Sequence, residues 1–144
     1  MNFFVNATPE AFSHFKSLPR GTAIHMLNLV RYKEWAEYPK GHPQSGSSWS
    51  GRRAYEEYGR LSEPILRSIG GEIVWRGAFE AMVIGDPEQV WDDAFIAHYP
   101  DVHAFLRLLK DPEFGPAFVH RDAGVLDYRL MRFAPGKLGG GFAA

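Results

Sequence analysis

Six histidines supply the side chains of this sequence that could exchange protons near neutral pH, because an unperturbed imidazole titrates there. His25 and His98 lie in stretches that we predict as strands, and His120 lies near the end of a predicted helix. We interpret His98 and His120 as candidate catalytic proton carriers. Two alternatives stay open: His98 is a hydrogen-bonded core side chain, and His120 with Arg121 stabilises the C-terminal end of its helix. We expect the other three histidines to be solvated on the surface: His14, His42 and His103.

A second set of side chains combines polar tips with aromatic rings or amides, which is typical of a small-molecule pocket. Its candidate ligand-binding members are Asn28, Arg31, Tyr55, Trp75, Arg76 and Arg121. Asn28 interrupts an apolar run, and a buried amide without a hydrogen bond costs on the order of 1 to 3 kcal/mol. Either a neighbouring protein group or a ligand carbonyl therefore satisfies Asn28. Tyr55 fits core packing as well as a pocket wall.

Several kinds of site are excluded by residues that the sequence lacks. It has no cysteine, no histidine pair four residues apart and no cluster of carboxylates with histidine, so we predict no metal site. The segment GSSWSG lacks the lysine of a phosphate loop. We predict no cofactor, although haem needs only one histidine as its axial ligand.

The charge and hydropathy of the chain limit its partners. Its 16 basic and 17 acidic residues are spread along the chain and give a net charge of -1, so we predict no nucleic-acid partner. No apolar run approaches the roughly 20 residues that span a bilayer, so we predict no membrane association. We expect a cytoplasmic protein.

Periodicity and turn residues divide the chain into alternating strands and helices. A helix is expected after the Thr8-Pro9 cap. The predicted strands are residues 22–32, a long segment at 71–85 with a bend or bulge at Gly77, 91–99 and 125–133. The predicted helices are residues 52–69, a helix capped by Asp101, and a segment from the Asp111-Pro112 cap to about residue 123. Residues 33–51 are rich in Gly, Pro and Ser and form a long loop, with Trp35, Tyr38 and Trp49 as apolar anchors.

This order predicts an α+β, ferredoxin-like βαββαβ fold, in which a four-stranded antiparallel sheet carries its helices on one face. We expect one domain over residues 1–134, with an N-terminal helical extension at 1–21, and a flexible glycine-rich tail at 135–144. The strands are apolar in both parities, so the opposite face of the sheet is left apolar and uncovered. Such a face needs a partner, and we predict a homodimer.

The segments MLNLVRYKEW, RRAYEEYGRLSEPILRSIGGEIVWRG and AMVIGDPEQVWDDAFIAHYPDVHAFLRLLKDPEF resemble the domain of unknown function 1330 family. The resemblance covers residues 24–133. It implies membership of the dimeric α+β barrel superfamily, in which two ferredoxin-like sheets close face to face. That superfamily includes cofactor-free monooxygenases, isomerases and haem enzymes. The loop at 33–51 and the N-terminal helix depart from the family pattern.

Two functions follow from these observations. The first is a small homodimeric protein that binds a small, partly apolar molecule in a pocket between the sheet and the helices. The alternative is a cofactor-independent, monooxygenase- or isomerase-like enzyme that acts on a small aromatic or carbonyl compound. In that alternative His98 or His120 carries the proton, and Asn28 and Arg76 stabilise the developing negative charge.

Overall fold

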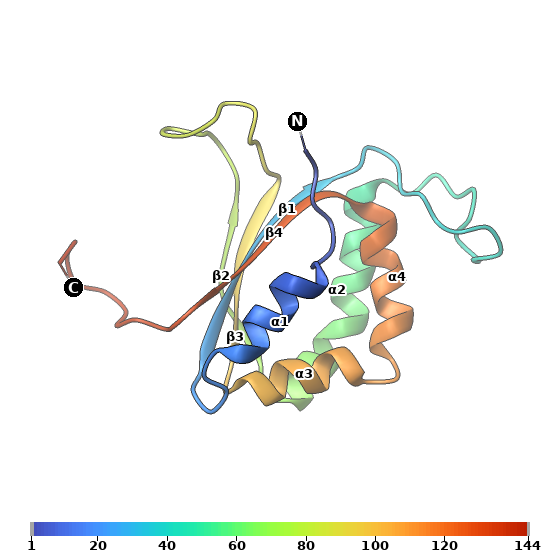
Figure 1. Ribbon diagram of the computed structural model, residues 1–144. Helices are drawn as coiled ribbons and strands as arrows, with labels where there is room; N and C mark the ends of the chain where they lie inside the picture. The colour runs from blue at the N-terminus through green and yellow to red at the C-terminus, as the bar shows by residue number, and fades with distance from the viewer. Residues whose placement is uncertain (1, 144) are drawn as a thin grey trace.

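The computed structural model describes residues 2–143, which form one sheet and the helices packed against it (Figure 1). The elements in chain order are α1 (Pro9–Ser17), β1 (Ile24–Tyr32), α2 (Gly51–Ser68), β2 (Glu72–Ala78), β3 (Asp93–Tyr99), α3 (Val102–Lys110), α4 (Phe114–Gly124) and β4 (Val125–Phe133).

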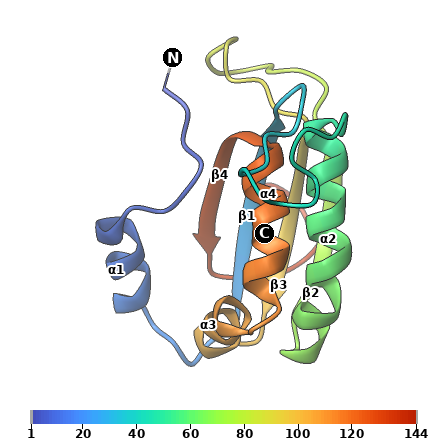
Figure 2. The same ribbon diagram turned by 90° about the vertical axis from the view of Figure 1, so that its right-hand side faces the viewer.

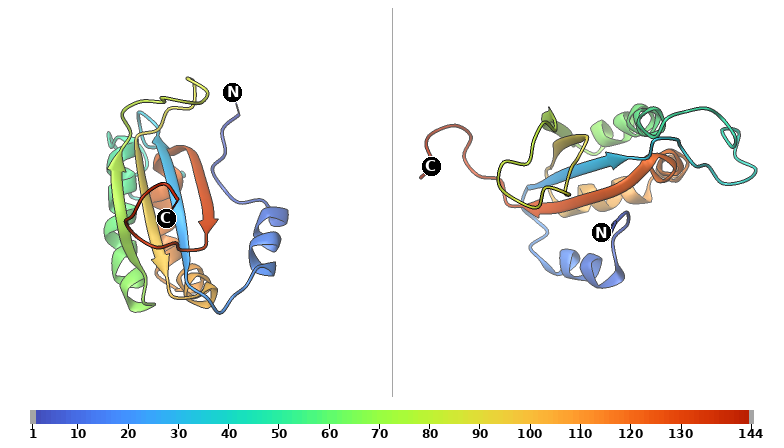
Figure 3. Two further views of the ribbon diagram at one scale, coloured as in Figure 1. Left: turned by 90° about the vertical axis from the view of Figure 1, so that its left-hand side faces the viewer. Right: turned by 90° about the horizontal axis from the view of Figure 1, so that it is seen from above.

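The four strands lie in the order β2-β3-β1-β4, and every neighbouring pair is antiparallel. β1 is therefore central, as its nearly continuous apolar run predicts, and the ferredoxin-like fold class is confirmed. Helices α2 and α4 lie side by side over one face of the sheet (Figure 2). The other face carries no helix, and α1 lies beyond the β4 edge (Figure 3, left).

Side chains alternate between these two faces along β1, because successive residues of a strand point to opposite sides. Ile24, Met26 and Val30 face the helices and are almost completely buried. They belong to two groups of core side chains, one reaching α3 and one centred on Tyr55 and Tyr128. The residues between them face the side without helices, which is called the open face below.

The prediction for the second strand is wrong in length and in the position of its irregularity. β2 ends at Ala78, opposite the first residue of β3, and residues 79–92 form a loop. The register shifts between Ile73 and Trp75, so the bulge lies before Gly77. A Cβ at Gly77 would lie 2.8 Å from the Trp75 ring, so this glycine provides room for the indole.

Side-chain caps begin three of the helices, which is how polar residues satisfy the free N–H groups of a first turn. Thr8 Oγ1 accepts from Ala11 N at 3.1 Å, as predicted, and Ser50 Oγ accepts from Arg53 N. Asp101 Oδ1 accepts from Ala104 N at 2.7 Å, which confirms the predicted cap. The cap predicted at Asp111-Pro112 is wrong, because Asp111 bonds the N–H of Glu113 in a turn before α4 begins.

Two glycines let α2 begin directly against the end of α4. A Cβ at Gly124 would collide with the carbonyl oxygen of Gly51, and a Cβ at Gly51 would lie 2.7 Å from the carbonyl oxygen of Gly124. Lys33 N donates to Gly124 O at 2.8 Å, so the chain leaving β1 is held at the same point. This contact fixes both ends of the loop at residues 33–51. Within residues 2–143, no helix has the length and hydropathy required to span a bilayer.

Candidate functional site

The long loop at residues 33–51 brings three aromatic rings to His120 on α4. Tyr38 Oη lies 2.6 Å from His120 Nδ1, and the two rings meet edge to face. Trp49 is stacked on His120 with an angle of 29° between the rings, and His42 is stacked on Tyr38 at 4.7 Å. We call Tyr38, His42, Trp49 and His120 the ring cluster.

Backbone hydrogen bonds hold the loop in this position. Glu37 N donates to Ala123 O at 2.9 Å, which fixes the residue before Tyr38 to the end of α4. Ala36 N donates to Trp49 O at 2.9 Å, so the two sides of the loop are joined near its base. The predicted anchoring is confirmed for Tyr38 and Trp49, whereas Trp35 is 60% exposed. His42 is half-buried, so the expectation that it is solvated is wrong.

Charged groups of α2 surround the ring cluster. The Arg53 guanidinium lies over the Trp49 ring at 4.1 Å from its centroid, a favourable cation–π distance. Burial lowers the pKa of His120, which the nearby Glu57 carboxylate partly opposes and His42 reinforces. Burial likewise raises the pKa of Tyr38. At neutral pH both hydrogen-bonded groups are therefore uncharged.

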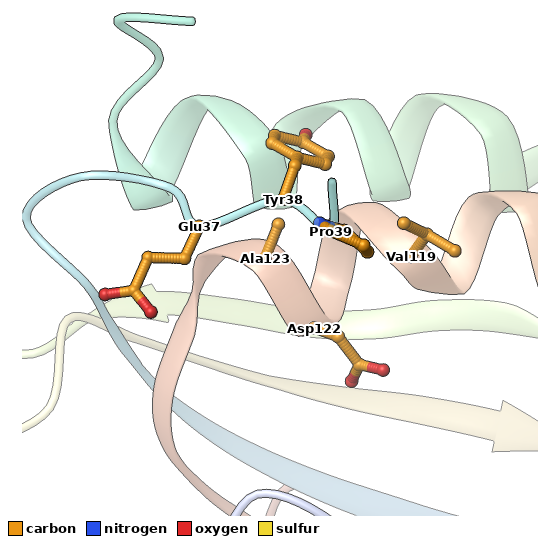
Figure 4. Close-up of a pocket in the computed structure, with 6 residues that line it drawn as sticks. All are labelled: Glu37, Tyr38, Pro39, Val119, Asp122 and Ala123. Carbon is orange, nitrogen blue, oxygen red and sulfur yellow. The ribbon is translucent and has the colours of Figure 1, made fainter. Parts of the chain in front are cut away.

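A cavity of about 420 Å³ lies between the loop and α4, and Tyr38 is the residue that it shares with the ring cluster (Figure 4). Its lining residues are Glu37, Tyr38, Pro39, Val119, Asp122 and Ala123. This volume falls in the range of about 300 to 1,000 Å³ that small-molecule sites occupy. Both carboxylates in its wall have cationic partners: Glu37 lies 3.3 Å from Lys33 Nζ and Asp122 lies 3.2 Å from Arg121.

Between the sheet and the helices, where a pocket is predicted, polar side chains bond one another. Tyr128 Oη donates to Asn28 Oδ1, Asn28 Nδ2 donates to Met26 O at 2.9 Å, and Tyr55 Oη lies 3.1 Å from Tyr128 Oη. Among residues 2–143, every fully buried side-chain nitrogen or oxygen has a partner. A neighbouring protein group therefore satisfies Asn28, which was one of its two open interpretations.

Arg121 joins this buried group instead of the ring cluster. Its guanidinium lies over the rings of Tyr128 and Phe118 and donates to Val5 O at 2.6 Å. Its neighbour His120 points to the loop, because consecutive residues of a helix are about 100° apart. The two side chains consequently do not converge on one ligand, contrary to the functional interpretation of the pair.

The open face holds a third group of predicted residues. His25 Nε2 lies 3.0 Å from His98 Nδ1 across β1 and β3, and Trp75 lies on the same face at the neighbouring strand. Burial, followed by the proximity of His98, lowers the pKa of His25. Arg31 lies on this face opposite Asp127 of β4. Arg76 points the other way, over the Phe95 ring at 5.8 Å.

The predicted site residues thus occupy separate places. Asn28, Tyr55 and Arg121 meet in the interior, and His98, Trp75 and Arg31 lie on the open face. His120 and Arg76 are apart from both groups. Sequence reasoning missed His42 as a contributor and did not pair Tyr38 with His120. The available signal was the density of aromatic residues in a loop rich in Gly and Pro. Across the part of the chain that the structure describes, no three His, Asp or Glu side chains are grouped as metal ligands.

Comparison with known proteins gives a family and a fold. A family model described as domain of unknown function (DUF1330) matches residues 48–132, so β1 and nearly all of the loop lie outside the match. The crystal structure of methylated RPA0582 has 43% sequence identity over 97% of this chain and 100% of that chain, with a TM-score of 0.87. A second structure of RPA0582, a protein of unknown function from Rhodopseudomonas palustris, has 42% identity over 94% and 99%, with a TM-score of 0.85. With such coverage, the loop and α1 are largely shared with this relative.

A more distant structure shares the fold alone. SnoaB, a cofactor-independent oxygenase from Streptomyces nogalater, has 16% identity over 83% of this chain and 99% of that chain, with a TM-score of 0.50. Among curated proteins, none matches the chain.

Proposed function

The chain belongs to the DUF1330 family, and from this premise we propose that it is a homodimer that binds a small, partly apolar molecule. The observation that carries the binding function is the ring cluster, whose Tyr38 also lines the cavity of about 420 Å³. Apolar walls with a few polar atoms are the usual composition of such sites. From composition alone, we also predict that neither nucleic acid nor a membrane is a partner and that the protein is cytoplasmic.

The open face supports the homodimer, with a second copy of the chain as its occupant. Apolar side chains from all four strands lie on it: Leu27, Leu29, Trp75, Ile96, Met131 and Phe133. Trp75 and Phe133 are each 50% exposed in the single chain. A continuous apolar surface of this kind is unusual on a monomer and typical of an interface. Arg31, Glu72 and Arg129 add both signs of charge to the same face, which suits pairing with an identical surface, whereas Asp127 is buried and pairs with Arg129.

Two extended segments on the same side of the sheet also favour a second copy. The loop at residues 79–92 and the C-terminal tail both project away from the helices, beyond the open face (Figure 1; Figure 3, right). Val83 and Ile84 at the tip of the loop are 89% and 92% exposed. Leu138 and Phe142 of the tail are exposed as well. In a dimer these side chains would have apolar surface within reach, since both segments extend toward the partner.

The ligand site that we propose differs in place from the pocket predicted between sheet and helices. Hydrogen bonds among Asn28, Tyr55 and Tyr128 use that interior for the protein's own contacts. The ring cluster, in contrast, is half-buried and accessible from solvent, and the loop that forms it is of the length usually associated with function. We therefore place the ligand beneath the loop, against Trp49 and His120.

A cofactor-independent enzyme is the second candidate, and the contact between His25 and His98 favours it. Two imidazoles 3.0 Å apart can pass a proton between them, and a second copy would enclose them. Asn28 and Arg76 lie on the other face of the sheet, so they cannot stabilise charge beside His98 within one chain. Unchanged turnover after replacement of His25, His98 and His120 together would remove this candidate.

The homodimer is tested by sedimentation velocity at micromolar concentration with Leu27→Asp. Leu27 lies in the middle of the open face, between Ile96 and Met131, so a carboxylate there would be buried without a partner in the dimer. We expect the parent chain to sediment as a dimer and the variant as a monomer. Leu109→Asp, at a partly exposed leucine of α3, is the matched control and should remain dimeric. A monomeric parent chain contradicts the proposal.

Ligand binding is tested by NMR, in a screen of small aromatic molecules against protein whose tryptophan indole groups are ¹⁵N-labelled. Binding should shift the Trp49 signal, and Trp49→Ala should weaken binding at least tenfold because the stacked wall is lost. Trp35→Ala is the matched control, since Trp35 lies in the same loop and is largely exposed. A screen in which no aromatic molecule shifts the Trp49 signal contradicts the proposed site.

A further inference from the structure

The hydrogen bonds of the ring cluster determine which ring nitrogens carry protons. Gln44 N donates to His42 Nδ1 at 3.0 Å. A backbone N–H is always the donor in such a contact, so Nδ1 of His42 is an acceptor without a proton. In a neutral imidazole the proton must then reside on the other nitrogen, Nε2.

The contact between Tyr38 and His120 has the same consequence for His120. A phenol is a far stronger acid than a neutral imidazole N–H, and an imidazole nitrogen is a stronger base than a phenol oxygen. Tyr38 Oη therefore donates to His120 Nδ1, and the O···N distance of 2.6 Å suits a strong O–H···N bond. His120 consequently carries its proton on Nε2 too.

The protonated ring nitrogens of the cluster favour electron-rich ligand groups. Arg53 lies over Trp49, and the Glu57 carboxylate near His120 is paired with Arg60 within α2. The rings of His42 and His120 have centroids 5.5 Å apart and are nearly perpendicular, so one small molecule can contact both. The cluster therefore presents two ring N–H donors and a guanidinium, with both Nδ1 acceptors already occupied.

From this juxtaposition we propose that the ring cluster binds a small aromatic molecule through a carboxylate or carbonyl oxygen, which accepts from His120 and His42. The ligand ring packs against Trp49. This inference rests on the proposed binding function and names its chemical class. It also assigns His120 the role of a hydrogen-bond donor, so His120 does not act as the general base of a reaction at this site.

The proton positions are tested by ¹⁵N NMR of the histidine rings at pH 7.5, which distinguishes the two neutral forms. We expect the form with the proton on Nε2 for His120 and His42. In Tyr38→Phe, His120 loses the hydroxyl that holds Nδ1 unprotonated, so its signals should move toward a mixture of both forms while those of His42 remain. A proton on Nδ1 of His120 in the parent protein overturns the inference.

Ligand class is tested with benzoate, acetophenone and benzylamine, which share a ring and differ in the attached group. Benzoate and acetophenone should bind, and protonated benzylamine should bind at least tenfold more weakly. Tyr38→Phe should weaken benzoate binding about threefold, a modest loss expected for one hydrogen bond. His103→Gln, at an exposed histidine of α3, should leave it unchanged.

The outcomes separate this inference from the function on which it rests. Equal binding of all three probes, or tighter binding of benzylamine, overturns the preference for an acceptor oxygen and leaves an apolar binding site in place. Failure of all three probes to bind, with no shift at Trp49, overturns both.

Discussion

The buried hydrogen bonds of Tyr128 predict a large loss of stability in Tyr128→Phe. Burial raises the pKa of the Tyr128 hydroxyl, so the group stays protonated and donates to Asn28 Oδ1, while its oxygen contacts the Tyr55 hydroxyl. The variant keeps the ring and removes both contacts. Loss of the contact with Tyr55 costs about 1 kcal/mol net, and loss of the contact with Asn28 costs about 1–3 kcal/mol because its oxygen is left buried without a donor.

We therefore expect the free energy of unfolding to fall by about 2–4 kcal/mol. For a chain of this size, the corresponding decrease in Tm is roughly 6–12 °C. The measurement is urea denaturation followed by far-UV circular dichroism, at one fixed protein concentration because a dimer's apparent stability depends on concentration. Tyr58→Phe is the matched control, since its ring contacts Tyr55 outside the hydrogen-bonded chain.

A double-mutant cycle tests the physical reason itself. Replacement of both partners, in Asn28→Leu with Tyr128→Phe, removes the amide oxygen that Tyr128→Phe alone leaves without a donor, while the contact with Tyr55 is lost in both variants. The loss of unfolding free energy in the double variant should be smaller than the sum of the two single losses by about 1 kcal/mol or more. Additive losses, or a Tyr128→Phe loss no larger than that of Tyr58→Phe, would refute the assignment of Tyr128 as the centre of the buried polar group.

Three further predictions concern other parts of the molecule. The pKa of His25 is lowered in the folded chain, so the folded state disfavours its protonation. The unfolded chain takes up this proton near pH 6.5, so the free energy of unfolding falls as the pH drops from about 6.5 toward the folded pKa. His25→Gln with His98→Gln should flatten the stability profile between pH 7.5 and 5.5 measured by denaturation, and an unchanged profile contradicts the prediction. Gly124→Ala should lower the free energy of unfolding by about 1–3 kcal/mol because its methyl group collides with the α2 backbone, whereas Gly115→Ala, in the same helix with open space around it, should be neutral or stabilising. Arg121→Met should speed limited proteolysis of the N-terminal segment, whose backbone and side chain it bonds, and equal cleavage rates would show that the segment is held otherwise.

How far the fold follows from the sequence differs between elements. The order of strands and helices and the central position of β1 follow from apolar periodicity and from caps such as Asp101, which act within a few residues. The length of β2 does not, since Phe79, Ala81 and Val83 continue a strand-like pattern. β2 ends because its partner β3 begins only at Asp93, and that limit is set by residues distant in sequence.

The candidate site depends even more on distant contacts. The residue types that matter, histidine, tyrosine and tryptophan, are visible in the sequence, and Tyr38 and Trp49 are predictable as anchors of a long loop. Their pairing with His120 is not, because Tyr38 and His120 are 82 positions apart in the sequence. The close approach of Gly51 and Gly124, and the hydrogen bond from Glu37 N to Ala123 O, bring their elements together.

By itself the sequence determined the fold class, the family and an apolar face of the sheet without a helical cover. The alternation of apolar and polar residues and the composition are local properties, so they do not depend on how the elements are arranged in space. The tertiary structure decided which polar groups meet. It brought Tyr38 to His120 and the N-terminal segment to Arg121, joined His25 to His98 through antiparallel register, and enclosed Asn28 among tyrosines. Each of these depends on the path of the whole chain, which no local pattern encodes.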